Sequence, residues 1–348
     1  MREEFERAGA SIMRPEETPN WQAEASQILE TLAFHHAQAG QYQQISAGGA
    51  DSAASLQADL HAVAPRLGHF AETLKSRLQQ AGCAVYVPQM GLTAFDTEQR
   101  ARLVYALTAC IGEPSATDAR NRQIIWDVAA RKTEGDYYAS FSEHDGEAAF
   151  HTDAQYYPNP ENYFALYVMN AARCGGGLSQ LCDGQALHAA LDKPQTRWAL
   201  RLLEERALPF RVPSAFVTDE RPGVVQAILA PVFSDAPGIR YRRDTLKSGL
   251  ELFPEHADED VEQAIKTLEQ TLKQLPGTLE FLIPTDSMLL VNNHRALHAR
   301  GAFKDAKRHL LRVRIHDVEY ERNELKMITL AHKAAECAIE KRSIHHEI

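Results

Sequence analysis

The feature that most constrains the fold is a series of short apolar runs that begins near Gln123 and continues through most of the remaining chain. Turn-forming residues separate these runs, and each run has the length of a β-strand rather than of a helix. Many short strands divided by turns favour a β-sandwich or a β-barrel. The runs are Ile124–Val128, Tyr137–Phe141, Tyr163–Met169, Leu178–Cys182, Val224–Phe233, Leu279–Ile283 and Met288–Val291.

Helical patterns flank and interrupt this β-rich region. Leu67, Phe70, Leu74 and Leu78 recur at helical spacing before Gly82, which predicts a helix that ends at the glycine. Asp96 with Gln99 resembles a capping box, so a further helix is expected after Asp96. Other stretches are also expected to be helical, and one is expected to be a loop. The helices are 21–39, 184–206, 257–274 and 321–341; the loop is 46–55, and a strand is expected at 83–87.

Composition excludes several classes of protein. The 348 residues are 44% hydrophobic and 24% charged, which is typical of a soluble globular chain. The formal net charge of −10 argues against a general nucleic-acid binder, which needs surplus cations. No apolar run is long enough to span a membrane, and the charged N-terminus does not resemble a secretory signal. We therefore expect a cytoplasmic protein without a nucleic-acid or membrane partner.

The first chemically informative motif is His151-Thr152-Asp153. In an extended segment, residues two apart point to the same side, so the imidazole and the carboxylate would converge. Histidine and carboxylate together are common ligands of first-row divalent metals. The pair alone is also compatible with a surface turn or with a simple His–Asp hydrogen bond.

The second motif lies between Asp286 and His316. A strand there is followed by a polar loop that contains His294 and His298, and then by an alternating strand. On this last strand one side is mostly basic and the other side is mostly apolar. The basic side is either a solvated edge, or it points into a barrel and binds carboxylates, which arginine does in a bidentate manner. The first side holds Arg308, Leu310, Arg312 and Arg314, and the second side holds His309, Leu311, Val313 and Ile315.

These segments together resemble the TauD/TfdA family of Fe(II)- and 2-oxoglutarate-dependent oxygenases, in its clavaminate synthase-like branch. The resemblance rests on His-x-Asp at 151–153, a distal His298, and Arg308 ten residues later. A further match is a Gly-Gly pair that is followed by a residue with a hydroxyl group. In this chain that residue is Ser179, where the family usually has threonine. The resemblance spans about residues 67–318. The remaining matching residues are Asn292, Asn293, Arg300, Phe303, Arg312, Gly176, Gly177 and Asp183.

The resemblance implies an α+β fold with a mainly β core, a double-stranded β-helix or jelly roll with flanking helices. It implies an oxygenase domain at 67–320, preceded by an N-terminal helical extension at 1–66 and followed by a helical tail at 321–348. It also implies that His151, Asp153 and His298 bind Fe(II), although His294 is an alternative distal ligand. Arg308 would bind the distal carboxylate of 2-oxoglutarate with help from Ser179. Arg312 would support the same carboxylate or reach the primary substrate.

The implied activity is hydroxylation of an unactivated C–H bond in a small polar substrate, with Fe(II), 2-oxoglutarate and O2 used to give succinate and CO2. The substrate is expected to be an amino acid or a natural-product intermediate, free or carrier-bound. Asp153 favours hydroxylation, desaturation or cyclisation over halogenation, since the related halogenases have a small residue in its place. The candidate substrate contacts are Gln155, Tyr156, Ser140, Arg240 and Arg312.

Three other functions stay open from the sequence. The chain is compatible with a taurine- or sulfonate-type catabolic dioxygenase. It is also compatible with a catalytically inactive jelly-roll binding protein, although the complete ligand set argues against that. A zinc hydrolase would use the same ligands but would leave the arginine-bearing strand without a role. A homodimer is a further expectation, because the N-terminal helices offer a surface.

Overall fold

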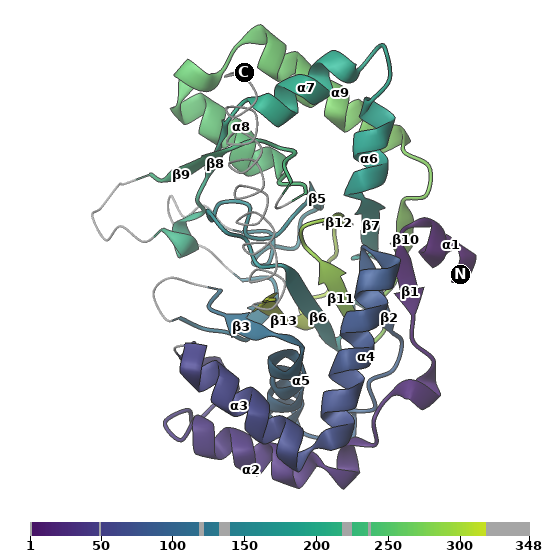
Figure 1. Cartoon of the computed structure of the whole chain (residues 1–348), viewed down its shortest axis with the longest axis vertical. Coiled ribbons are helices and arrows are strands. Elements are labelled where there is room, and N and C mark those ends of the chain that lie inside the picture. Colours follow the sequence, from purple (N-terminus) through teal and green to yellow (C-terminus); the bar gives the residue numbers. More distant parts are fainter. Residues whose placement is uncertain are drawn as a thin grey trace, which may run out of the picture.

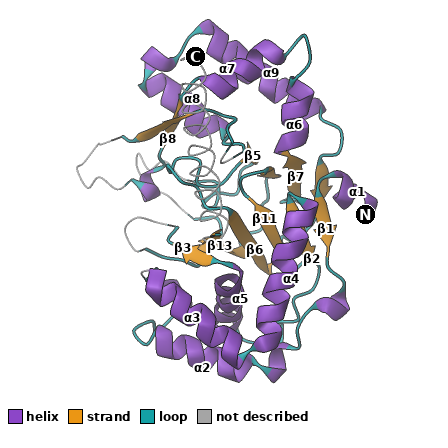
Figure 2. Ribbon diagram, viewed as in Figure 1, coloured by secondary structure: helices purple, strands orange, loops and turns teal. Residues whose placement is uncertain are grey.

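The computed structural model describes residues 2–48, 50–117, 122–131, 140–217, 225–235 and 238–317. Two β-sheets dominate its centre, and helices lie outside both of them (Figures 1 and 2). The larger one, the major sheet, has the order β1-β2-β11-β6-β13-β3, and β4 also pairs with β13. Its strands are β1 Ala10–Ile12, β2 Ala84–Val87, β3 Glu113–Ser115, β4 Trp126–Val128, β6 Tyr163–Asn170, β11 Met288–Asn292 and β13 His309–His316.

The smaller one, the minor sheet, has the order β10-β7-β12-β5, and all its pairings are antiparallel. Its strands are β5 Ala148–His151, β7 Ser179–Asp183, β10 Leu279–Phe281 and β12 Ala296–Arg300. A separate hairpin-like pair joins β8, Leu208–Arg211, to β9, Ala227–Ala230.

The two sheets pack face to face because their strands alternate. On β6, Phe164 and Val168 face the minor sheet and share a buried cluster with its Leu181. Tyr163 and Ala165 face the opposite way, into a second cluster. This arrangement confirms the predicted α+β fold with a double-stranded β-helix core.

Helices cover the outer face of each sheet. The first group packs on the major sheet, where its apolar residues share one cluster with Leu311 and Val313 of β13. The second group packs on the minor sheet, against Cys182 and Leu297. Figure 1 shows the two groups at opposite ends of the molecule. The first group is α2 Ala25–His35, α3 Ala50–Val63, α4 Pro65–Ala81 and α5 Thr97–Ile111; the second is α6 Gly184–Leu191, α7 Arg197–Glu205, α8 Arg243–Leu252 and α9 Glu259–Gln274.

Several local expectations are confirmed. Asp96 caps α5 by accepting a hydrogen bond from the Gln99 amide at 2.8 Å, and the Gln99 side chain accepts one from the Asp96 amide, which completes the capping box. Helix α4 ends at Gly82, whose φ of 95° is in the left-handed region that glycine adopts readily.

Other expectations are wrong in part. The predicted loop at 46–55 contains the start of α3 at Ala50, because alanine-rich sequence is a good helix former once its apolar residues find a core. The single helix expected over 184–206 is two helices, with Pro194 in the break between them. Helix α8 was not predicted. The expected strand at 137–141 lies largely outside the described residues, and the expected helix at 321–341 lies wholly outside them.

The N-terminal region is joined to the rest through a shared core. Strand β1 extends the edge of the major sheet by pairing in parallel with β2. Met13, Trp21 and Ile28 belong to the same buried cluster as residues of β6 and β13. The division into segments at residues 66 and 320 stays a prediction. Within the described residues, no helix is long and apolar enough to cross a membrane.

Candidate metal centre and cosubstrate pocket

The minor sheet brings two histidines together. His151, at the end of β5, is directly opposite His298 of β12, and their ring centroids are 4.1 Å apart. A register shift between His298 and Arg300 bends this edge of the sheet. The expectation that His298 lies in a loop is wrong: its neighbours Ala296, Leu297 and Ala299 are buried, and the segment pairs with both β5 and β7.

Asp153 reaches the same point from the loop that follows β5. Its Oδ1 lies 3.7 Å from Nε2 of His151 and 3.9 Å from Nε2 of His298. The Asn293 side chain fixes the backbone of this loop with two hydrogen bonds. Its Oδ1 accepts from the Asp153 amide at 2.7 Å, and its Nδ2 donates to the Asp153 carbonyl at 3.0 Å. The three side chains offer ligand atoms that all lie within 4.8 Å of one another, which is close enough for one metal ion.

Both imidazoles are kept neutral, as metal ligation requires. Burial lowers the pKa of His298 to about 4 and also holds the pKa of His151 well below its ordinary value. Nδ1 of His151 hydrogen-bonds the Ala149 carbonyl at 2.8 Å, so this nitrogen donates in the neutral ring. The Nε2 lone pair is therefore directed at the cluster.

Two arginines hold the other oxygen of Asp153. Arg312 Nη1 lies 2.8 Å from Oδ2, and Arg314 Nε lies 3.7 Å from the same atom. Burial alone would raise the pKa of Asp153, but the two guanidinium groups keep it well below its ordinary value. The carboxylate is thus ionised, with Oδ1 toward the histidines and Oδ2 toward the arginines.

A cavity extends from the two histidines between the sheets. Its apolar wall includes Leu166, Leu289 and Leu310, and its polar residues include Ser179, Arg308 and Arg312. Burial lowers the pKa of Arg308 to about 10, so the guanidinium stays charged at neutral pH. Its Nη1 has no hydrogen-bond partner among the described residues. A buried cation with a free N–H group fits an incoming carboxylate.

The Gly176-Gly177 pair lets the chain pass close to the loop at Ala302 and Phe303. A Cβ on Gly176 would meet the Ala302 carbonyl oxygen at 2.5 Å, and one on Gly177 would meet Nε of Arg308 at 3.4 Å. Gly177 also has a φ of 75°, where side chains are strained. The glycines therefore let the chain pass close to this loop, with Arg308 in ordinary contact, before β7 begins at Ser179.

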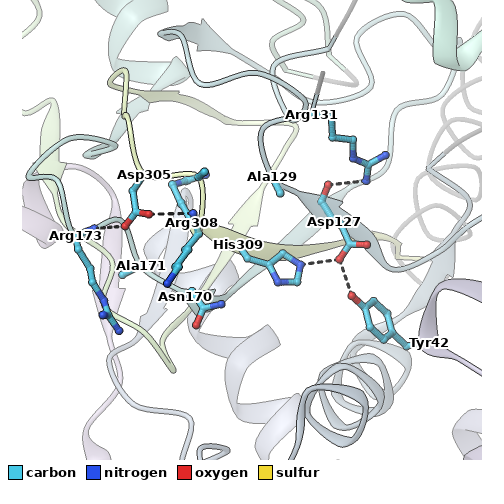
Figure 3. A pocket seen from close by; sticks show the side chains of 12 residues that line it. Tyr42, Asp127, Ala129, Arg131, Asn170, Ala171, Arg173, Asp305, Arg308 and His309 are labelled. Atoms are coloured by element: carbon cyan, nitrogen blue, oxygen red, sulfur yellow. Dashed lines mark hydrogen bonds and ion pairs between the residues drawn. The ribbon is translucent and has the colours of Figure 1, made fainter. Parts of the chain in front are cut away.

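A second hollow of about 670 Å³ lies near the start of β13, and Arg308 lines it as well as the inner cavity (Figure 3). Figure 3 shows His309 and Tyr42 directed at the Asp127 carboxylate, which accepts from Tyr42 Oη at 2.7 Å and lies 2.7 Å from His309 Nε2. The sequence had indicated neither Asp127 nor this hollow, because its residues come from distant segments.

The remaining predicted site residues have varied surroundings. His294 Nε2 lies 2.9 Å from the Pro160 carbonyl, so this ring holds a loop, and it is not in the three-residue cluster. Arg240 donates to the carbonyls of Gln155 and Tyr157 at 2.6 Å, which fixes the backbone beyond Asp153. Ser140 hydrogen-bonds Ser142, which lines the inner cavity.

Gln155 and Tyr156 are both buried close to the metal cluster. Gln155 donates through Nε2 to Thr245 Oγ1 at 3.1 Å, while its Oε1 has no partner in the described chain. Tyr156 Oη accepts from Arg314 Nη2 at 3.1 Å. The predicted substrate roles of these residues stay predictions. Sequence reasoning missed the contact of Arg314 with Asp153, although strand alternation had placed Arg314 on the same side as Arg312.

The family model "Taurine catabolism dioxygenase TauD, TfdA family" matches residues 43–314, which is most of the chain and begins earlier than the resemblance had indicated. Among curated proteins, none matches this sequence.

Solved structures show the same fold. One is an asparagine oxygenase in complex with Fe(II), 2S,3S-3-hydroxyasparagine and succinate, with a TM-score of 0.60 at 13% identity over 88% of this chain and 93% of that one. Another is a point mutant of the non-heme iron oxygenase OrfP in complex with (3S)-hydroxy-L-Arg, with a TM-score of 0.58 at 17% identity over 90% of this chain and 96% of that one. OrfP with Fe and alpha-ketoglutaric acid has a TM-score of 0.57 at 16% identity over 90% of this chain and 96% of that one.

The family match agrees with the resemblance drawn from the motifs, while the clavaminate synthase-like branch stays a prediction. A fold match at such low identity shows architecture and leaves the substrate open. On the family match over residues 43–314, the chain belongs to the TauD/TfdA family of iron- and 2-oxoglutarate-dependent dioxygenases.

Proposed function

We propose that this chain hydroxylates a small amino-acid substrate, with Fe(II) held by His151, Asp153 and His298 and with 2-oxoglutarate anchored by Arg308. The observation that carries the proposal is one continuous cavity. Its inner end has the two imidazoles, and its wall has a buried guanidinium with an unpartnered N–H group. Two neutral histidines and one carboxylate form the donor set typical of non-heme Fe(II) oxygenases.

Each residue has a defined task in this proposal. The depressed pKa values of His151 and His298 keep their nitrogens unprotonated and ready to bind the metal. Arg312 occupies Oδ2 of Asp153, so Oδ1 is the oxygen available to the metal. When bound, the iron supplies the oxidising chemistry that turns 2-oxoglutarate, O2 and a C–H bond into succinate, CO2 and an alcohol.

The cosubstrate end of the cavity suits a dicarboxylate. Arg308 offers a charged, desolvated donor, and Ser179 adds a hydroxyl on the same wall. Arginine binds a carboxylate in a bidentate manner and does not lose its proton at working pH. Leu166, Leu289 and Leu310 keep water away from the carbon chain between the two carboxylates.

The amino-acid part of the proposal draws on the neighbours. The asparagine oxygenase contains hydroxyasparagine and succinate, and OrfP contains hydroxylated arginine and succinate. Near the metal cluster, this chain offers polar groups for such a molecule, namely Gln155 Oε1 and the N–H groups of Arg312. Attachment of the substrate to a carrier, and a homodimer, stay predictions.

The test is succinate formation by the purified chain with Fe(II), ascorbate, 2-oxoglutarate and a panel of amino acids. We expect amino-acid-stimulated succinate formation and a product heavier than the substrate by one oxygen atom. Asp153→Ala should abolish both. Turnover by Asp153→Ala at the parent rate would show that the metal-ligand assignment is wrong.

A taurine-type dioxygenase is the second candidate, and the family model's own description favours it. It predicts sulfite release from taurine or another sulfonate, which the same assay detects once these compounds are added to the panel. Binding of Fe(II) and 2-oxoglutarate without any stimulated turnover would instead support a binding protein that has lost its activity.

A further inference from the structure

One buried cation in the wall of the inner cavity is Arg300. It ends β12 two residues after His298, and both side chains line the cavity. Arg300 is 8% exposed, and burial lowers its pKa to about 10, so the guanidinium stays charged at neutral pH. A buried charge is costly unless it is well bonded, so the partners of Arg300 indicate its task.

The partners of Arg300 are three backbone carbonyls in one short segment. Nη1 donates to the Phe141 carbonyl at 3.1 Å, and Nη2 donates to the His144 carbonyl at 3.0 Å and also to that of Gly146. Residues 140–147 directly precede β5 and form no strand themselves. Arg300 therefore supplies hydrogen bonds that a neighbouring strand would otherwise supply, and its fork of N–H groups suits this task.

This segment carries Phe141, which packs against a histidine of the metal cluster. The Phe141 ring meets the His151 imidazole edge to face, with centroids 4.8 Å apart and ring planes at 76°. The Arg242 guanidinium lies over the Phe141 ring, with its carbon 3.8 Å from the ring centroid. Phe141 and His151 also line the inner cavity together. The phenylalanine is thus held in direct contact with the imidazole.

The other restraint on the His151 ring is a single hydrogen bond. Nδ1 bonds the carbonyl of Ala149, which is only two residues away, at 2.8 Å. One such bond restrains a ring weakly, whereas a metal ligand has to stay within about 0.5 Å of its working position. Packing against Phe141 supplies the second restraint.

His298 has a comparable neighbour that needs no clamp. Its ring lies against Phe164, with centroids 4.7 Å apart. Phe164 belongs to β6, in the interior of the major sheet, and is fully buried, so the sheet itself holds this ring in place. Phe141 lies outside any strand, and Arg300 gives its segment the rigidity that the sheet gives Phe164.

We propose that Arg300 and Phe141 form one positioning unit, in which Arg300 fixes the segment that carries Phe141 and the Phe141 ring holds His151 with Nε2 toward the metal. Both residues act through His151, and neither is a ligand. The inference rests on the proposed function, from which it takes the ligand role of His151. Residues that orient a ligand in this way typically contribute about 10- to 100-fold to metal affinity.

The direction of the effect separates positioning from simple electrostatics. Arg300 is a cation in the wall of a site for a divalent cation, so the loss of its charge alone would strengthen metal binding. Loss of a positioning residue weakens it instead. We therefore expect Arg300→Met to raise the Kd for Mn(II) about tenfold, measured by calorimetric titration of the full chain. Binding as tight as in the parent, or tighter, would overturn the inference.

Variants of Phe141 test the second half of the unit. Phe141→Ala should raise the Kd for Mn(II) about tenfold, and Phe141→Tyr, which keeps the ring, should stay within about threefold of the parent. Because Arg300 acts through Phe141, a chain with both Arg300→Met and Phe141→Ala should bind Mn(II) about as well as either single variant. If the two effects multiply instead, Arg300 acts independently of Phe141 and the unit does not exist.

Hydrogen exchange tests whether the segment itself loosens. In the full chain without metal, the amides of residues 140–147 should exchange about fivefold faster, or more, in Arg300→Met than in the parent. The matched control is Arg295→Met, which removes a guanidinium from a bidentate pair with Asp183. It should leave both this exchange and the Kd for Mn(II) within about twofold of the parent. If Arg295→Met changes both as much as Arg300→Met does, the effect is general destabilisation and the inference is wrong.

The Mn(II) titration also separates this inference from the proposed function. A parent chain that binds no Mn(II) fails the metal-ligand assignment itself. A parent chain that binds Mn(II), with the same affinity in Phe141→Ala, fails only the positioning unit.

Discussion

Replacing Asp153 by asparagine separates the charge of this residue from its shape. Asparagine fills the same space, but it is neutral, and its amide group brings donors toward Arg312 and Arg314. Asp153 is 5% exposed and is paired with Arg312 at 2.8 Å, so little solvent screens the loss. Removing one partner of a buried ion pair costs about 3–5 kcal/mol, and we expect the metal-free variant to lose free energy of unfolding in that range.

Metal binding should fall as well. The carboxylate is the only anionic group of the three-residue cluster, and its Oδ1 lies within 4 Å of both histidine nitrogens. We expect the Kd for Mn(II), a redox-stable substitute for Fe(II), to rise about 100-fold or more, which corresponds to roughly 2.7 kcal/mol. Succinate formation should fall at least as far. Urea unfolding, calorimetric titration with Mn(II) and a succinate assay measure the three effects.

Asp183→Asn is the matched control for this variant. Asp183 caps α6 through the Gln185 amide at 2.9 Å and pairs with Arg295 at 2.7 Å, so its replacement should also lower stability. It lies outside the three-residue cluster, and the Kd for Mn(II) should therefore change less than about threefold. An Asp153→Asn protein that keeps the parent Kd for Mn(II) would refute the assignment of Asp153 as a ligand.

Other substitutions probe the cosubstrate anchor, the buried histidines and the fold. Arg308→Met should raise the concentration of 2-oxoglutarate needed for half-maximal succinate formation by about 10- to 100-fold, because a buried charge-assisted contact is lost. The affinity for Mn(II) should stay within about threefold of the parent, because the contact lies away from the metal. An unchanged 2-oxoglutarate requirement would contradict the anchor role. The free energy of unfolding of the metal-free chain should fall as pH drops from about 6.5 toward 4, by up to about 3 kcal/mol for His298 alone, since the unfolded chain takes up a proton before the folded one does. Urea unfolding across this pH range checks the slope, which should become shallower in His298→Gln and would contradict the reasoning if it did not. Asp286→Ala should lower the free energy of unfolding by about 2–4 kcal/mol and leave the Mn(II) affinity unchanged. The buried Asp286 carboxylate accepts hydrogen bonds from the Gly91 and Leu92 amides and from Tyr167 Oη at 2.8–3.0 Å, and the variant loses them. If urea unfolding shows that Asp286→Ala is as stable as the parent, this role is contradicted.

Much of the β core could be predicted because its signal is local. The apolar run of β6 marks it as a strand, alternation along β13 separates a mostly basic side from a mostly apolar side, and the capping residues of α5 identify its start. The position of His298 was harder to predict. The segment around it is only five residues long, and it becomes a strand because β5 and β7 are available on both sides.

The metal cluster was predictable to the extent that it follows a motif with a fixed spacing. His151, Asp153 and His298 converge as the resemblance implied. Arg312 shows the limit of this reasoning. Alternation grouped it with Arg308 and Arg314 on one side of the strand, but left open whether that side is solvated or points inward. Its contact with Asp153 depends on a loop geometry that Asn293 and Arg240 fix through backbone atoms. Such contacts join residues more than 80 positions apart and leave no local pattern in the sequence.

The arginines on one side of β13 show why contacts, rather than residue types, distinguish the tasks of similar side chains. On the sequence, Arg308, Arg312 and Arg314 form one basic face, and nothing distinguishes them. In the structure, Arg308 lines the cavity, Arg312 lines it too and pairs with Asp153, and Arg314 is buried beside Asp153 and Tyr156. The three side chains therefore have different surroundings, and these surroundings, which the sequence does not show, decide which of them can reach a ligand.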